Sequence, residues 1–216
     1  MRLLEGRPET RLERDAWPAV RNAATQMCFV IIGEPGSGKS GLSYALAVDS
    51  QQVGTDPVFL PVDQLAVTSE AALRAELGIT HNLADVPAHW PGRDGALLIV
   101  DALDAARSGA TRSVFQTAIA EVTHLSEGRW RVVASVRTYD LRHGLGWPRL
   151  FAGPTPATEH ANQEFKDVRH VAVGHLTDAE VSVLIPLPND EIKLRSVSFN
   201  HEANAGAETR PTLSFR

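Results

Sequence analysis

The hydrophobic residues of this chain gather in short runs that are separated by longer polar and mixed segments. Residues 27–32 (MCFVII) and 96–100 (ALLIV) are apolar throughout, with no alternation of polar and apolar positions. Uninterrupted runs of this length are typical of strands that are buried on both faces, as in a parallel sheet. We therefore predict two central strands, over residues 27–32 and 96–101.

Three other runs predict further strands, over residues 57–62 (PVFLPV), 130–136 (WRVVASV) and 169–174 (RHVAVG). Pro61 lies inside the first of these runs, and proline has no N–H group to donate to a neighbouring strand. We therefore expect that strand at an edge of the sheet.

Between the runs, apolar residues recur at helical spacing. This pattern predicts helices over residues 41–50, 69–77 and 111–125. Ser69 is a suitable N-cap for the second helix, and Gly78 permits the left-handed conformation in which many helices end.

The remaining segments are less regular. Residues 8–25 carry a rough helical stripe that Pro18 interrupts, so we expect two short helical pieces or a kink. Residues 81–95 and 141–161 are rich in turn-forming residues and are predicted to be loops.

The C-terminal part of the chain loses its periodicity. Residues 176–184 begin like a helix, because Thr177 and Glu180 have the spacing of a capping box. Residues 187–216 have no sustained period and are expected to be irregular or disordered. A truncated or frame-shifted chain would have the same appearance.

The order of strands and helices predicts a three-layer α/β domain with a parallel sheet. An extra strand between the first strand and the strand over residues 96–101 favours the strand order 5-1-4-3-2. We expect a helical lead-in over residues 1–25, the α/β domain over 26–182 and an irregular tail over 183–216.

The first strand runs directly into the octet GEPGSGKS, which fits the phosphate-binding P-loop pattern G-x-x-x-x-G-K-[ST]. A predicted helix follows, so strand, loop and helix N-terminus occur in the order that a P-loop NTPase domain needs. The predicted phosphate-binding residues are Gly33, Glu34, Pro35, Gly36, Ser37, Gly38, Lys39, Ser40 and Gly41.

These residue types suit a nucleotide with Mg²⁺. The N–H groups of the first turn of a helix lack intrahelical partners, and the helix dipole favours an anion there. Glycines let the loop turn its N–H groups inward, and Lys39 would supply a charge to the β- and γ-phosphates. The hydroxyl of Ser40 would be a ligand for Mg²⁺, which prefers hard oxygen ligands.

Asp101 ends the apolar run over residues 96–101, an arrangement that is typical of the Walker B carboxylate that holds Mg²⁺ in a P-loop protein. Asp104 follows three residues later. It would orient or deprotonate the attacking water, or it would cap the next helix, and these two interpretations are compatible.

Arg137 follows the strand over residues 130–136, at the edge where ligands gather in parallel sheets. We predict that it senses or stabilises the γ-phosphate. The alternatives are a salt bridge to Asp140 or a solvated loop arginine. Asp63, which follows the strand over residues 57–62, is more simply a solvated loop carboxylate.

The composition is that of an ordinary globular chain of 216 residues, with 43% hydrophobic and 22% charged residues. The net charge of −5 argues against a nucleic-acid partner. Cys28 is the only cysteine and lies in a predicted strand, so we expect no intramolecular disulfide and a cytoplasmic protein. We expect no signal peptide and no membrane span.

The segments GEPGSGKS, LLIVDALD and VVASVR resemble the nucleotide-binding core of STAND-type ATPases, and the bacterial NACHT-like branch most closely. This family resembles AAA+ ATPases and serves as signalling or defence switches. Its second motif has glycine and glutamate where this chain has Ala102 and Ala105, and the missing glutamate implies inefficient hydrolysis. The resemblance covers residues 10–182.

The resemblance implies an ATP- and Mg²⁺-binding core of a switch ATPase, with Asp101, Asp104 and Arg137 as catalytic residues and a protein partner or self-association through the domain. The family's helical lid and winged-helix domain do not fit in the remaining residues, so we expect weak turnover. Alternatives are a small-molecule or nucleoside kinase, with Arg142 and Arg149 as lid arginines, or a fragment that binds nucleotide without turnover.

Overall fold

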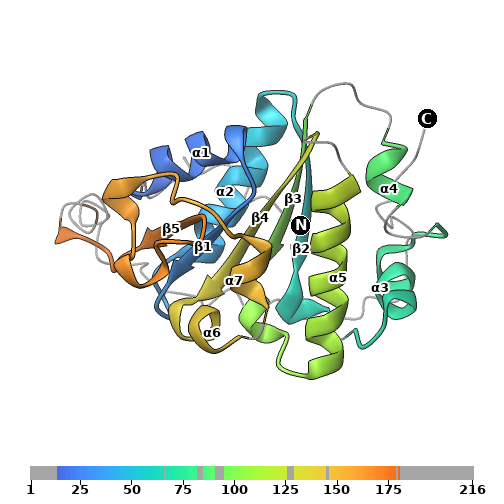
Figure 1. The fold of residues 1–216 in the computed structure, drawn as a ribbon. Coiled ribbons are helices and arrows are strands. Elements are labelled where there is room, and N and C mark those ends of the chain that lie inside the picture. Colours follow the sequence, from blue (N-terminus) through green and yellow to red (C-terminus); the bar gives the residue numbers. More distant parts are fainter. Residues whose placement is uncertain are drawn as a thin grey trace, which may run out of the picture.

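The computed structural model describes residues 14–65, 67–81, 85–90, 95–125, 129–144, 146–178 and 180. Five parallel strands form one sheet in the order β2-β3-β4-β1-β5 (Figure 1). This is the predicted order 5-1-4-3-2 read from the other edge, and the strand with Pro61 lies at an edge, as predicted. The strands are β1 (Phe29–Gly33), β2 (Asp56–Pro61), β3 (Ala96–Asp101), β4 (Trp130–Arg137) and β5 (His170–Val173).

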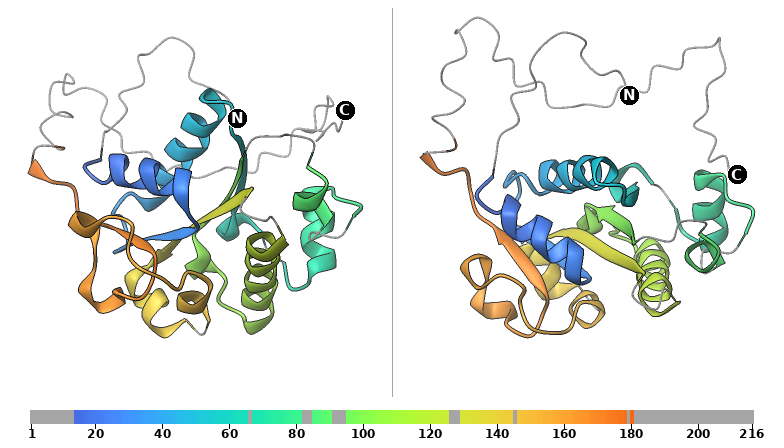
Figure 2. Two further views of the ribbon diagram at one scale, coloured as in Figure 1. Left: turned by 45° about the horizontal axis from the view of Figure 1, so that its top comes forward. Right: turned by 90° about the horizontal axis from the view of Figure 1, so that it is seen from above.

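Helices cover both faces of the sheet. They are α1 (Trp17–Gln26), α2 (Lys39–Gln52), α3 (Glu70–Leu77), α4 (Asp85–Ala88), α5 (Gly109–Leu125), α6 (Thr138–His143) and α7 (Trp147–Leu150). Helices α1 and α2 lie on one face, whereas α5, α6 and α7 lie on the other (Figures 1 and 2). No helix among the described residues is long and apolar enough to cross a membrane.

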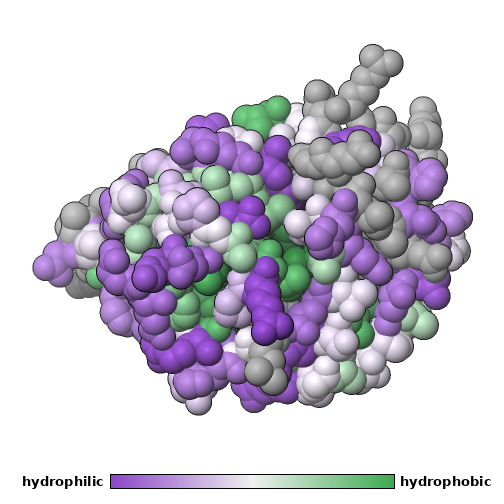
Figure 3. All heavy atoms as spheres, viewed as in Figure 1, coloured by the Kyte–Doolittle hydropathy of each residue, from purple (hydrophilic) through white to green (hydrophobic). Residues whose placement is uncertain are grey.

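Each face of the sheet has its own hydrophobic core. In β1, Phe29 and Ile31 pack with α1 and α2, whereas Val30 and Ile32 pack on the side of α5. Successive side chains of a strand point to opposite faces, so an apolar run without alternation is what a strand covered on both sides requires. The prediction of central strands buried on both faces is confirmed. The face seen in Figure 3 is mostly hydrophilic, with apolar residues visible near its centre.

The ends of α3 follow the predicted capping chemistry. The Ser69 hydroxyl accepts a hydrogen bond from the Ala72 N–H group at 3.1 Å, and Gly78 adopts the left-handed conformation at the C-terminus. The capping box near the end of the described chain is also present. Thr177 N–H donates to Glu180 at 2.7 Å, and Glu180 N–H donates to the Thr177 hydroxyl at 3.2 Å.

Pro18 does not kink α1, because this helix begins at Trp17 and the first turn tolerates proline. Residues 8–13 of the predicted lead-in lie outside the described residues. Two predicted loops contain helices. The predicted loop over residues 81–95 contains α4. The predicted loop over residues 141–161 contains part of α6 and the whole of α7. Trp147 and Phe151 are buried there, so tertiary packing holds a segment whose glycines and prolines favour loops. The predicted tail over residues 183–216 lies outside the described residues.

Candidate functional site

The loop between β1 and α2 is shaped by its glycines. Gly36 and Gly38 have φ angles of +78° and +87°, in the left-handed region that disfavours other residues. Gly33 is required for space, because a Cβ atom there would lie 2.5 Å from the Val173 carbonyl oxygen and 2.6 Å from the Ser37 hydroxyl. The loop thus reaches the N-terminus of α2 in a conformation that only this glycine pattern permits.

The ammonium group of Lys39 folds back over the loop. It donates hydrogen bonds of 2.9 Å to the carbonyl oxygens of Gly33 and Glu34. An ammonium has three N–H donors, so these contacts use two of them. Burial lowers the pKa of Lys39, and the nearby Asp104 carboxylate opposes that shift. The Asp101 and Glu34 carboxylates also favour the charged form of Lys39, whereas Arg137 disfavours it.

Asp101 is buried at the end of β3, and β4 holds its carboxylate in place. The Ser135 hydroxyl donates to Asp101 Oδ1 at 2.5 Å and accepts a hydrogen bond of 2.8 Å from the Ala102 N–H group. Ser135 was not among the predicted site residues. The parallel register, in which Val100 lies opposite Ala134, would have placed it beside Asp101.

Asp104 and Arg137 form an ion pair of 2.7 Å at the carboxyl edge of the sheet. The carboxylate is 12% exposed and the guanidinium side chain 43% exposed. The structure therefore brings together two residues that were predicted separately, and the partner of Arg137 is Asp104 rather than Asp140. The charges of Asp104 and Arg137 both affect the pKa of Lys39, so the pair lies close to the glycine loop between β1 and α2.

Asp104 does not cap the next helix. It lies in a short 3₁₀ turn over Leu103–Ala105, whereas α5 begins at Gly109. The cap of α5 is Ser108, whose hydroxyl accepts a hydrogen bond of 3.0 Å from the Thr111 N–H group. The carboxylate of Asp104 is therefore not used for helix capping.

Ala102 turns the chain between Asp101 and Asp104. Its φ angle is +58° and its ψ angle +48°, so it is the only left-handed residue other than glycine in the described part of the chain. This position is the one at which the STAND pattern has glycine. The turn aims both carboxylates at the same edge of the sheet, at a conformational cost of about 1–2 kcal/mol for a residue with a Cβ atom.

Ser40 and Asp101 are the predicted Mg²⁺ ligands, and a hydroxyl with a carboxylate is a donor set that suits this ion. Ser40 is exposed on the first turn of α2. Within the described ranges, no group of three or more His, Cys, Asp or Glu side chains is arranged to hold a metal ion. An ion here would take its other ligands from phosphate and water, as Mg²⁺ commonly does.

The other residues of the loop, and residues near it, differ in how far they are buried. Gly41 is exposed and a Cβ atom there would meet no neighbour, whereas Ser37 is buried under the loop. Asp63 is exposed in a short turn after β2, and this turn contacts the turn that carries Asp104. Arg14, which was not predicted, donates a hydrogen bond to the carbonyl oxygen of Ser37 from beneath the loop.

No family model and no curated protein matches the chain. Solved structures match its fold. DnaA from Aquifex aeolicus bound to AMPPCP has a TM-score of 0.51 and 15% identity, over 78% of this chain and 48% of DnaA. The ORC1 protein of Aeropyrum pernix in complex with DNA has a TM-score of 0.51 and 11% identity, over 79% of this chain and 48% of ORC1. A Walker-type ATPase of Pyrococcus abyssi has a TM-score of 0.50 and 12% identity, over 82% and 59%.

The chain thus spans about half the length of these proteins. At such identities the likeness concerns the fold alone. The shared fold is the predicted three-layer P-loop NTPase fold, with a five-stranded parallel sheet.

Proposed function

We propose that this chain binds ATP with Mg²⁺ and hydrolyses it slowly, as the nucleotide-binding core of a switch ATPase. The observation that carries the proposal is the position of Lys39. Its ammonium lies buried at the N-terminus of α2, in a glycine loop, within the electrostatic reach of Asp101, Asp104 and Arg137. Loop N–H groups, a helix dipole and a buried cation together suit a polyphosphate.

The first step is the binding of the phosphates. The N–H groups of the loop and of the first turn of α2 would surround the β-phosphate. Lys39 would exchange its hydrogen bonds to Gly33 and Glu34 for phosphate oxygens. A charge-assisted hydrogen bond contributes about 1.5–3 kcal/mol, so this exchange favours the phosphate over the loop carbonyls.

Mg²⁺ would be held by Ser40 and by Asp101, directly or through water, and would neutralise charge on the β- and γ-phosphates. The hydrogen bond from Ser135 fixes the orientation of the Asp101 carboxylate. Because the Asp101 carboxylate is already oriented, it would lose little conformational entropy when the ion binds.

Asp104 and Arg137 are the residues that we propose for the hydrolysis step. A γ-phosphate would compete with Asp104 for the half-exposed Arg137 guanidinium, which pairs well with phosphate. Asp104 would then be free to orient the attacking water, while Arg137 stabilises charge on the γ-phosphate. Ala105, which stands where the STAND pattern has glutamate, is the reason to expect slow hydrolysis.

The role in signalling or defence rests on the resemblance to STAND and NACHT-like ATPases, which predicts a protein partner or self-association through the domain. The DnaA structure contains AMPPCP and the ORC1 structure contains DNA. The loop motif supports a nucleotide here as well. For DNA the chain offers no matching motif, and its net charge of −5 opposes a polyanion.

The kinase alternative loses one of the two arginines that suggested it. Arg142 forms a bidentate ion pair with Glu164, so its guanidinium is engaged within the domain. Arg149 is exposed in α7. A lid arginine for phosphoryl transfer has to be available to the substrate.

A turnover assay tests the proposed reaction. ADP release from MgATP is expected without an added acceptor, and Asp104→Asn is expected to bind ATP as well as wild type but to release ADP about 100-fold more slowly. ADP release that depends on a nucleoside or other small-molecule acceptor would contradict hydrolysis and favour a kinase. An unchanged rate in Asp104→Asn would remove Asp104 from the chemical step.

A further inference from the structure

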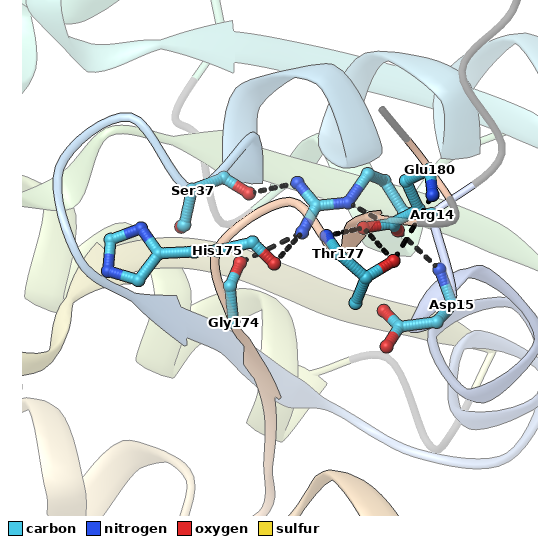
Figure 4. Close-up of polar contacts among 7 residues, drawn as sticks. All are labelled: Arg14, Asp15, Ser37, Gly174, His175, Thr177 and Glu180. Carbon is cyan, nitrogen blue, oxygen red and sulfur yellow. Dashed lines mark hydrogen bonds and ion pairs between the residues drawn. The ribbon is translucent and has the colours of Figure 1, made fainter. Parts of the chain in front are cut away.

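A single arginine side chain joins three separate segments directly beneath the phosphate-binding loop (Figure 4). Arg14 donates from Nη1 to the Ser37 carbonyl oxygen, and from Nη2 to the Gly174 carbonyl oxygen at 2.8 Å. Its Nε donates to Glu180 Oε1 at 2.9 Å. The segments are the one before α1, the loop itself and the one that follows β5.

The contact with Ser37 orients one peptide group of the loop. In a trans peptide, the C=O and the following N–H point in opposite directions. Because the Ser37 carbonyl oxygen points down to Arg14, the Gly38 N–H group points up, away from the guanidinium. A Cβ atom on Gly38 would lie 2.6 Å from Arg14 Nη1, so the glycine also permits this close approach. Arg14 thereby holds a phosphate-binding donor in position without touching the phosphate.

The Nε side of the Arg14 guanidinium is held by a buried ion pair with Glu180. The side chains of Arg14 and Glu180 are each 6% exposed. The Glu180 carboxylate also accepts hydrogen bonds from the N–H groups of Asp15, at 2.9 Å, and Thr177, at 2.7 Å. A buried ion pair with its remaining lone pairs satisfied resists rearrangement, because removal of either partner leaves an uncompensated charge.

We propose that Arg14 is a positioning residue that couples the occupancy of the phosphate-binding loop to residues 174–178 and Glu180, which follow β5. The inference rests on the proposed nucleotide binding. A phosphate on the Gly38 N–H group polarises the Ser37–Gly38 peptide and strengthens the hydrogen bond that its carbonyl accepts from Arg14. The same planar guanidinium holds Gly174 and Glu180, so ordering of the loop orders the exit from β5.

Hydrogen exchange of the full chain, with and without saturating MgATP, measures this coupling directly. In wild type, MgATP is expected to slow the exchange of amides 36–40 and also of amides 174–178, the latter by about fivefold. Protection of amides 36–40 alone would overturn the coupling. Absence of protection at amides 36–40 would instead contradict the proposed nucleotide binding.

Two variants separate coupling from folding. Arg14→Lys keeps the buried charge, but a single ammonium cannot reproduce the fork that reaches Ser37, Gly174 and Glu180 at once. The double variant Arg14→Met, Glu180→Gln leaves no unpaired buried charge. In both, MgATP is expected to protect amides 36–40 but not amides 174–178, and the Kd for MgATP is expected to rise about tenfold.

Arg21→Met is the matched control. Arg21 also precedes β1 and forms an ion pair of 2.9 Å, with Asp49, but its side chain is 53% exposed and makes no contact with the loop. This variant is expected to keep both protected regions. Persistence of the protection at amides 174–178 in Arg14→Lys or in the double variant would overturn the role of Arg14, and so would its loss in Arg21→Met.

Discussion

At the scale of single residues, Ala102 has a backbone conformation that is unusual for alanine. The turn between the two aspartates requires a left-handed residue, and alanine occupies that position with φ of +58°. The Ala102 N–H group donates a hydrogen bond to the Ser135 hydroxyl, so the turn leaves no unsatisfied donor at this residue. This turn places Asp104 against Arg137, so the strain is part of the construction of the site.

Ala102→Gly is therefore expected to stabilise the protein by about 1 kcal/mol, because glycine adopts the left-handed conformation without a Cβ penalty. Urea unfolding measures the difference. Ala105→Gly, in the same turn but without a positive φ angle, serves as the control and is expected to destabilise by about 0.5–1 kcal/mol. A loss of stability in Ala102→Gly comparable to that of the control would contradict the strain.

Sequence patterns were sufficient for the residues that carry the motifs and insufficient for their partners. Lys39, Asp101 and Asp104 could be predicted because short spacings in the chain define them. Arg14 could not, because its carboxylate partner lies 166 residues away. Contacts of this kind depend on how β5 returns beside β1, which no local pattern encodes.

At the scale of elements, β5 carries a buried histidine at the edge of the sheet. The neutral ring of His170 donates from Nδ1 to the Val168 carbonyl oxygen at 2.7 Å, and its Nε2 accepts a hydrogen bond of 2.7 Å from the Asn162 N–H group. Burial lowers the pKa of His170 in the folded protein. The ring thus ties β5 to the irregular segment before it.

This arrangement predicts a specific dependence of stability on pH. Because the pKa of His170 is lower in the folded state than the usual 6.5, its contribution is fully present above about pH 6.5 and is lost as the pH falls. The free energy of unfolding of wild type is expected to decrease between pH 7.5 and 5.5 more steeply than that of His170→Gln. Equal slopes would contradict a buried neutral histidine.

The strands and long helices could be predicted well, and the short helices could not. In a parallel sheet, an apolar run such as residues 96–101 is expected to be a strand that is buried on both faces. The observed β3 has the predicted bounds. The four-residue helix α7 contains Pro148 and follows Gly146, which locally favours a turn. It forms because Trp147 and Phe151 are buried against the sheet and α5.

At the scale of the whole molecule, the P-loop NTPase fold brings the carboxyl ends of β1, β3 and β4 to one edge. The glycine loop, Asp101 and the Asp104–Arg137 pair come from these three strand ends. The fold and the position of the site thus follow from the same parallel sheet.

The affinity for MgATP, measured by isothermal titration calorimetry on wild type, Lys39→Ala and Lys166→Ala, tests the proposed site most directly. Lys166 is exposed and distant from the loop motif in sequence, and it provides a matched loss of one positive charge. Wild type and Lys166→Ala are expected to bind equally, whereas Lys39→Ala is expected to bind about 10- to 100-fold more weakly. Equal affinities of wild type and Lys39→Ala, or no binding by wild type, would contradict a nucleotide site in this loop.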